Sequence, residues 1–265
     1  MKDKIESLEL LLAQNGRSTF DRIISELGKD SNLDSQIFML LAKLNDSRAL
    51  FPLINYATKS KETEHTQRLL QYMAHTMDPR SEDFLYNYLG ILTRPHRQIA
   101  EDAYQKCRDN HEFIYQFAGS DKLYNRALDS LGGILVTSEN LTKFENAINE
   151  NKNPSNKPQT YVITMNGKML IGINLNEHVF VAKGQDVCAA GEIIFGKTSQ
   201  GWRVNYVNNR SNGYFPHKSS FHWVRKYFDK SNIRFGKEDF DDVFPRQGFN
   251  DEDFLSVQKF GNFHS

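Results

Sequence analysis

The sequence predicts an α+β protein of more than one domain, in which an array of α-helices precedes a small domain built on an antiparallel sheet. Apolar residues recur at helical spacing through about the first 150 positions. A polar segment with two prolines follows at 147–158, and strand-like alternation begins after it. We therefore expect a helical domain at 1–150, a basic α+β domain at 159–236 and an acidic tail at 237–265.

Composition narrows the class of protein. The 265 residues are 39% hydrophobic and 25% charged, which is ordinary for a soluble globular chain. No apolar run approaches the roughly 20 residues that a membrane helix needs. Cys107 and Cys188 lie far apart without metal-type spacing, so we expect reduced thiols in a cytoplasmic protein that has neither a metal nor a cofactor.

The helical half contains a short internal sequence repeat, which we call the echo. Residues 46–56 realign 32 positions later with residues 78–88, and Asp, Arg, Leu, Asn and Tyr coincide at the same offsets. A fixed period between about 20 and 50 residues predicts helix pairs that stack on one another. An irregular helical bundle without a binding role is the alternative.

The first copy of this echo resembles the inter-helix turn and second helix of a HEAT-type repeat. The residues that carry the resemblance are Leu44, Asp46, Arg48, Ala49, Leu50, Pro52, Leu53 and Ile54. Residues 97–104 similarly resemble the first helix of another such repeat. The resemblance implies that the aspartate of the turn caps the second helix. It also implies a curved surface that binds a protein partner.

Strand signals dominate the second domain. A hairpin is predicted at 161–173 around the turn Asn166-Gly167, because Asn-Gly tolerates positive φ angles. A short strand is predicted at 179–181, and a second hairpin at 187–207. A helix at about 220–230 should bury Phe221, Val224 and Phe228.

Charge is distributed unevenly. Residues 151–236 hold 12 basic and 4 acidic side chains, a net charge of +8, whereas residues 1–150 and 237–265 each have a net charge of −4. The basic block predicts an anionic partner. Alternatively, it complements the acidic tail, whose six phenylalanines suggest that it packs on the other domains.

The segment between the last strand and the last helix is the candidate ligand site. Backbone amides near a helix N-terminus favour anions, and a tyrosine can stack on a ring. The candidate residues are Asn208, Asn209, Arg210, Ser211, Gly213, Tyr214, Lys218, Ser219 and Ser220. A well-capped structural loop is the alternative. Together with residues 189–192, this stretch resembles an uncharacterised bacterial domain, which implies no mechanism.

Catalytic signals are sparse. Glu192 and His217 are the candidates for acid–base chemistry near that segment, and no nucleophile is paired with them by spacing alone. Residues 191–198 match the phosphate-loop pattern GxxxxGK[ST], but strand-like residues flank the pattern where a helix is required. We therefore interpret it as part of a hairpin.

These observations favour a non-enzymatic interaction protein. We expect its helical repeats to bind a protein partner and its basic domain to bind an anionic group. Two alternatives are an enzyme acting on a nucleotide-like substrate and a protein that binds single-stranded nucleic acid, since basic and aromatic residues interleave at 202–226.

Overall fold

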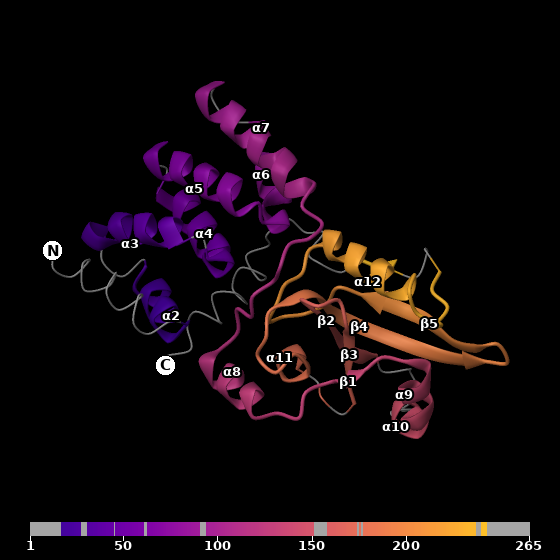
Figure 1. The fold of residues 1–265 in the computed structure, drawn as a ribbon. Coiled ribbons are helices and arrows are strands. Elements are labelled where there is room, and N and C mark those ends of the chain that lie inside the picture. Colours follow the sequence, from indigo (N-terminus) through magenta and orange to yellow (C-terminus); the bar gives the residue numbers. More distant parts are fainter. Residues whose placement is uncertain are drawn as a thin grey trace. The chain divides into compact units, whose positions relative to one another are not determined.

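The computed structural model shows an α+β protein with helices and a mixed six-stranded sheet, so the predicted class is confirmed. The described residues divide into two compact units, one on each side of the boundary between Asn110 and His111. Figure 1 labels their elements. The structure describes residues 17–27, 31–44, 46–60, 63–90, 94–150, 158–173, 175, 177–236 and 240–242.

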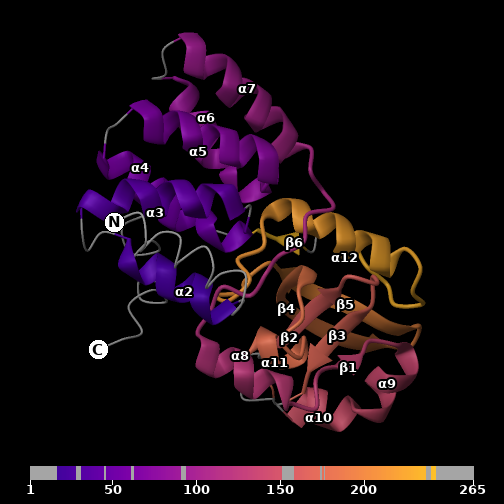
Figure 2. The same cartoon turned by 60° about the vertical axis from the view of Figure 1, so that its left-hand side comes forward.

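The first unit consists of helices in successive pairs. Helices α3, α5 and α7 pack one on the next, and α2, α4 and α6 each pack on the longer helix that follows (Figure 2). Helices α3, α4, α5 and α7 each bury one side, because their apolar residues recur three and four residues apart. The elements are α2 (Arg17–Glu26), α3 (Ser31–Leu44), η1 (Ser47–Ala49), α4 (Leu50–Ser60), α5 (Thr63–Thr76), η2 (Pro79–Ser81), α6 (Glu82–Leu89) and α7 (Arg94–Arg108).

The sequence echo corresponds to a turn that occurs twice. Asp46 and Asp78 each accept a hydrogen bond of 3.0 Å from the backbone N–H two residues later, which caps η1 and η2 respectively. The same two carboxylates also hold the guanidinium groups of Arg48 and Arg80, at 2.6 and 2.5 Å. The echo therefore encodes the same local structure in both copies.

The second unit is built on a sheet with strand order β1-β3-β2-β4-β5-β6. Adjacent strands are antiparallel except β5 and β6, which run parallel, so the sheet is not purely antiparallel as predicted. The elements are α8 (Asp121–Leu128), β1 (Ile134–Leu135), α9 (Ser138–Lys143), α10 (Glu145–Glu150), β2 (Gln159–Thr164), β3 (Met169–Gly172), α11 (His178–Val181), β4 (Val187–Thr198), β5 (Gly201–Asn208), η3 (Lys218–Ser220), α12 (Phe221–Phe228) and β6 (Phe240–Asp241).

Both faces of this sheet are covered (Figure 1). Side chains alternate between the two faces of the sheet along β2. Tyr161 and Ile163 therefore join the buried cluster that contains the inner face of α12, whereas Val162 joins the cluster that contains residues of α8 and α11. The predicted inner face of α12 is confirmed, because Phe221, Val224 and Phe228 are all buried. The strand predicted at 179–181 is wrong: these residues lie in α11. A three-residue apolar run does not distinguish a buried helical turn from a strand.

The boundary between the units also differs from the predicted one. It lies at Asn110–His111 rather than at 147–158, because β1 pairs with β3 and Tyr115 bridges Val187 of β4. Residues 151–157 lie outside the described residues. Of the predicted tail, Phe240 stacks on Phe221 with ring centres 3.9 Å apart, and β6 extends the sheet. Residues 237–239 and 243–265 lie outside the described part.

Candidate functional site

The predicted ligand segment at 208–220 is folded largely into the interior of the second unit. Arg210 and Lys218 are exposed, and Gly213 and Ser219 are half-buried. The buried members of the predicted set are Asn208, Asn209, Ser211, Tyr214 and Ser220. The two cations are therefore accessible to solvent, while most of the predicted donors are not.

Hydrogen bonds within the protein occupy the side chain of Asn208. Its Oδ1 accepts hydrogen bonds from the backbone N–H groups of Glu192 and Arg210, at 2.8 and 2.9 Å. Its Nδ2 donates to Glu192 Oε2 at 2.9 Å and to the Tyr206 hydroxyl at 2.8 Å. Because both ends of the amide are occupied, this residue fixes β4 against the end of β5.

Asn209 and Tyr214 are also held by the chain itself. Asn209 Nδ2 donates to the Pro216 carbonyl at 3.1 Å and to Asp242 Oδ1 at 2.9 Å. The hydroxyl of Tyr214 donates to the Gln185 carbonyl at 2.6 Å. These contacts satisfy buried polar groups, which is the role that a structural loop requires.

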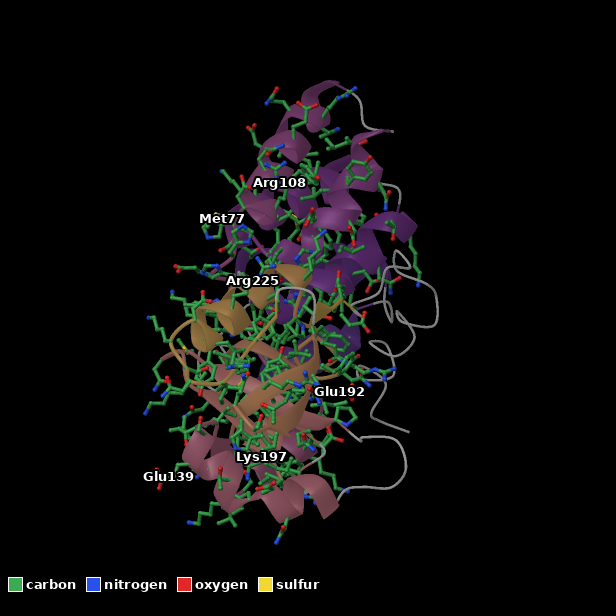
Figure 3. The ribbon with its side chains drawn as sticks, turned by 90° about the vertical axis from the view of Figure 1, so that its right-hand side faces the viewer. Met77, Arg108, Glu139, Glu192, Lys197 and Arg225 are labelled. Carbon is green, nitrogen blue, oxygen red and sulfur yellow. The ribbon has the colours of Figure 1, made fainter. Side chains whose placement is uncertain are left out.

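Each of the two catalytic candidates is held by other groups of the fold. Glu192, labelled in Figure 3, is half-buried on β4, where its carboxylate accepts from Asn208. His217 is buried, and its Nδ1 accepts from the backbone N–H of Ser219 at 3.3 Å, which caps η3. Among the described residues, Glu192 makes no hydrogen bond to His217.

The phosphate-loop pattern at 191–198 lies within β4, so its interpretation as part of a hairpin is confirmed. Its first glycine is explained by close packing. A Cβ atom at Gly191 would lie 1.9 Å from the carbonyl oxygen of Asn208. Only glycine permits that approach.

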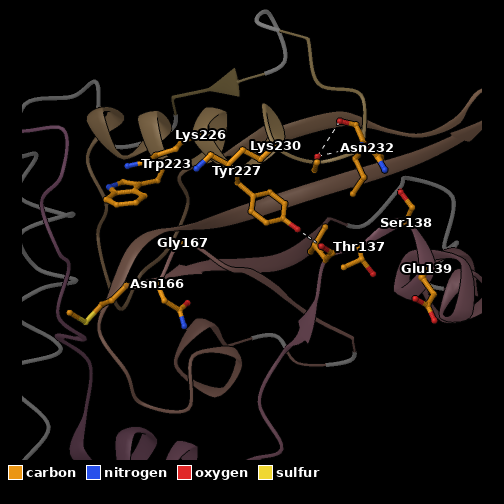
Figure 4. A pocket seen from close by; sticks show the side chains of 14 residues that line it. Thr137, Ser138, Glu139, Asn166, Gly167, Trp223, Lys226, Tyr227, Lys230 and Asn232 are labelled. Atoms are coloured by element: carbon orange, nitrogen blue, oxygen red, sulfur yellow. Dashed lines mark hydrogen bonds between the residues drawn. The ribbon is translucent and has the colours of Figure 1, made fainter.

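A cavity of about 780 Å³ lies beside α12, and we refer to it as the α12 cavity (Figure 4). Trp223, Lys226, Tyr227 and Lys230 line one wall, spaced three and four residues apart so that they share one side of the helix and its extension. The opposite walls come from the start of α9 and the turn between β2 and β3. Those lining residues are Val136, Thr137, Ser138, Glu139, Met165, Asn166 and Gly167, and the segment after α12 adds Ser231, Asn232 and Ile233.

The α12 wall combines two lysines with two aromatic residues. Lys226 Nζ lies 4.3 Å from the ring centre of Trp223 and 3.5 Å from the Glu112 carboxylate. The indole N–H of Trp223 is enclosed and has no hydrogen-bond partner among the described residues. Lys230 is exposed and forms no ion pair with any described acid. Burial raises the pKa of Tyr227, and its hydroxyl donates to the Val136 carbonyl.

The sequence did not single out this cavity, although it carried a signal. The residues at 223, 226, 227 and 230 form the second, amphipathic side of a helix whose other side is Phe221, Val224 and Phe228. Which walls face that side depends on the β2–β3 turn and on α9, more than fifty residues earlier in the chain. That relationship becomes visible only in the folded unit.

No protein-family model, curated protein or solved structure matches this chain. Within the described residues, no three side chains of histidine, cysteine, aspartate or glutamate gather as a metal site would require. No helix in the described part is both long enough and apolar enough to cross a membrane.

Proposed function

We propose that the protein is a non-enzymatic binding protein whose second unit holds an anionic small molecule in the α12 cavity. The volume of about 780 Å³ is typical of small-molecule sites, which span roughly 300–1,000 Å³. The observation that carries the proposal is the α12 wall itself. Lys226, Lys230 and Trp223 belong to that one wall, and a ligand that joins an anionic group to an apolar part matches them.

The distribution of charge locates the anionic end of the ligand. Glu139 is the one acid among the lining residues, and it comes from α9, away from the lysines in Figure 4. We therefore expect the negative group beside Lys226 and Lys230. Its apolar part lies against Trp223, whose side chain offers the largest apolar area on that wall.

The test uses 8-anilinonaphthalene-1-sulfonate, a fluorescent probe that combines an aromatic body with one negative charge. The double variant Lys226→Ala/Lys230→Ala should weaken binding by about tenfold, the loss of roughly one charge-assisted hydrogen bond. Lys168→Ala removes an exposed lysine that does not line the cavity and serves as the matched control. Equal affinity in the double variant and the control would refute the proposal.

For the helical unit we propose binding of a protein partner, as the HEAT-like resemblance implies. An exposed aromatic and arginine cluster on α6 and α7 supports this. Tyr86 is 66% exposed, and its ring centre lies 6.1 Å from that of Tyr104. Arg108, labelled in Figure 3, lies 5.8 Å from the Tyr104 ring centre. Tyrosine and arginine are enriched where protein interfaces derive most of their affinity.

This second proposal is tested by affinity purification from the native cell with the full chain. A partner bound through the cluster should be lost with Tyr86→Ala and kept with Gln98→Ala, an exposed residue on α7. Retention of the same partner by Tyr86→Ala would exclude the cluster. The alternatives of an enzyme and of a nucleic-acid-binding protein receive less support, because Glu192 and His217 are engaged by the fold and Trp202 is only 4% exposed.

A further inference from the structure

Two arginines lie side by side at the edge of the sheet. Arg203 of β5 and Arg234, which follows α12, form an isolated parallel β-bridge. The Val204 N–H donates to the Arg234 carbonyl at 2.8 Å, and the Arg234 N–H donates to the Trp202 carbonyl at 3.0 Å. Bridge partners direct their side chains to the same face, about 5 Å apart at Cβ. Both arginines are exposed.

This pairing is electrostatically unfavourable by itself. Like charges directly opposite each other destabilise a pair of strands. Within the described part of the chain, neither arginine forms an ion pair with an acid; Arg234 donates instead to the neutral side-chain oxygen of Gln200. A local arrangement that opposes stability without internal compensation is typical of a binding site.

The two arginines also line a cavity of about 400 Å³, which they share with Val204, Asn205, Phe235 and Gly236. Asn205 lies two residues after Arg203 and is exposed like it. Its amide lies flat against Gly196 of β4, where a Cβ atom would come within 2.5 Å of Asn205 Nδ2. The bare glycine therefore leaves room for the Asn205 amide, a donor that lines the same cavity as the two arginines.

We propose that Arg203 and Arg234 bind the dianionic phosphoryl group of a small phosphorylated molecule, with Asn205 as an additional donor. Two guanidinium forks match a tetrahedral dianion with three terminal oxygens, whereas a monocarboxylate is satisfied by one fork. This site is separate from the α12 cavity, because the two share no lining residue. It therefore goes beyond the proposed function.

Aromatic side chains near the arginines do not favour nucleic acid. Trp202 is buried, and its indole N–H donates to Thr142 Oγ1 at 3.0 Å. Phe235 packs on Phe221 and Phe228, with ring centres 5.6 and 5.0 Å away. Neither ring is a free platform for stacking a base, which single-stranded nucleic acid requires. The recognised group is therefore the phosphoryl group itself.

The experiment measures binding of inorganic phosphate and of phosphoserine to the full chain by calorimetry, at constant ionic strength. Arg203→Ala and Arg234→Ala should each weaken binding of both probes by about tenfold or more. Arg203→Lys keeps the charge but loses the bidentate guanidinium group. Its affinity for both probes should therefore lie between those of the unchanged chain and Arg203→Ala. Gly196→Ala, which displaces the Asn205 amide, should weaken binding less than either arginine variant.

Controls separate this site from other basic residues. Lys168→Ala should leave phosphate affinity unchanged, since this exposed lysine lines neither cavity. Without phosphate, Arg203→Ala should raise the melting temperature, because it removes the like-charge contact. Added phosphate should raise the melting temperature of the unchanged chain, and it should raise that of Arg203→Ala much less.

Three results would overturn the proposal. The first is undetectable phosphate binding by the unchanged chain. The second is phosphate binding that appears only in the double variant Glu238→Gln/Asp239→Asn, because the arginines of the unchanged chain would then pair with these two acids. Both acids lie outside the described residues. The third is a single-stranded oligonucleotide that binds through the same arginines while phosphate and phosphoserine do not.

Discussion

The guanidinium group of Arg80 donates a hydrogen bond of 3.1 Å to the carbonyl oxygen of Ser47, 33 positions earlier in the chain. The same group is held by Asp78, and both side chains are almost fully buried, at 1% and 0% exposure. It also lies 5.4 Å from the ring centre of Phe51. The second copy of the repeated turn is therefore tied to the first through one buried ion pair.

Replacing Arg80 with alanine should destabilise the protein by about 3–5 kcal/mol, because the Asp78 carboxylate would stay buried without its partner. The matched control is Arg97→Ala, which removes the exposed pair with Glu101 on α7 and should cost at most about 0.5 kcal/mol. Urea denaturation followed by circular dichroism measures both. Similar losses in the two variants would show that burial of the Arg80 pair contributes nothing.

The two capped turns were predictable from the sequence because their determinants are local. The offset of 32 residues places an aspartate, an arginine and a leucine identically in both copies, and a cap at Asp46 or Asp78 involves atoms only two residues apart. The inner face of α12 was predictable for the same reason. Helical periodicity is a local property.

The boundary and the candidate site were harder to predict because they depend on contacts between distant residues. Tyr115 belongs to the second unit because it forms a β-bridge with Val187. No pattern in the sequence of residues 111–150 indicates that pairing. The residues at 208–220 were correctly placed between a strand and a helix. Their burial, however, depends on distant partners such as Gln185 and Asp242. A polar, glycine-containing segment looks the same in sequence whether it binds a ligand or fills a corner of the fold.

Gly191→Ala should destabilise the second unit by about 3 kcal/mol or more, since the new methyl group would overlap the Asn208 carbonyl. Gly167→Ala provides the comparison. Gly167 has a φ of +74° in the β2–β3 turn and open space around it, so only conformational strain of about 1 kcal/mol is expected. Thermal unfolding ranks the two variants, and a Gly191→Ala protein as stable as Gly167→Ala would contradict the steric explanation.

Both cysteine thiols should react slowly in the native protein. Burial raises the pKa of Cys107 to about 12 and that of Cys188 to about 11, from 9.0, and both residues are buried. At about pH 8, a thiol of pKa about 11 is roughly a hundredfold less ionised than one of pKa 9.0, and the thiolate is the reactive species. A colorimetric disulfide reagent should titrate the 2 thiols promptly only after denaturation. Prompt reaction of either thiol in the native chain would contradict its burial.

Acid should weaken the second unit through His178. Burial lowers the pKa of His178 from 6.5 to about 4, and its Nε2 must carry the proton that it donates to the Gly191 carbonyl at 2.9 Å, so the neutral ring is the native form. Between about pH 6.5 and about pH 4, the unfolded chain binds a proton at this position and the folded chain does not. The free energy of unfolding should therefore fall as the pH decreases from about 6.5 to about 4, by about 3 kcal/mol in total.

The variant His178→Gln isolates this contribution from that of the other histidines. Glutamine keeps a side-chain N–H for the Gly191 carbonyl and does not titrate. We expect the variant to be less stable than the unchanged chain at neutral pH and to lose less stability on acidification. Urea denaturation at several pH values between about 7 and 4 gives the two slopes. Parallel pH profiles would mean that His178 titrates equally in the folded and unfolded chains, which its enclosure beside β4 argues against.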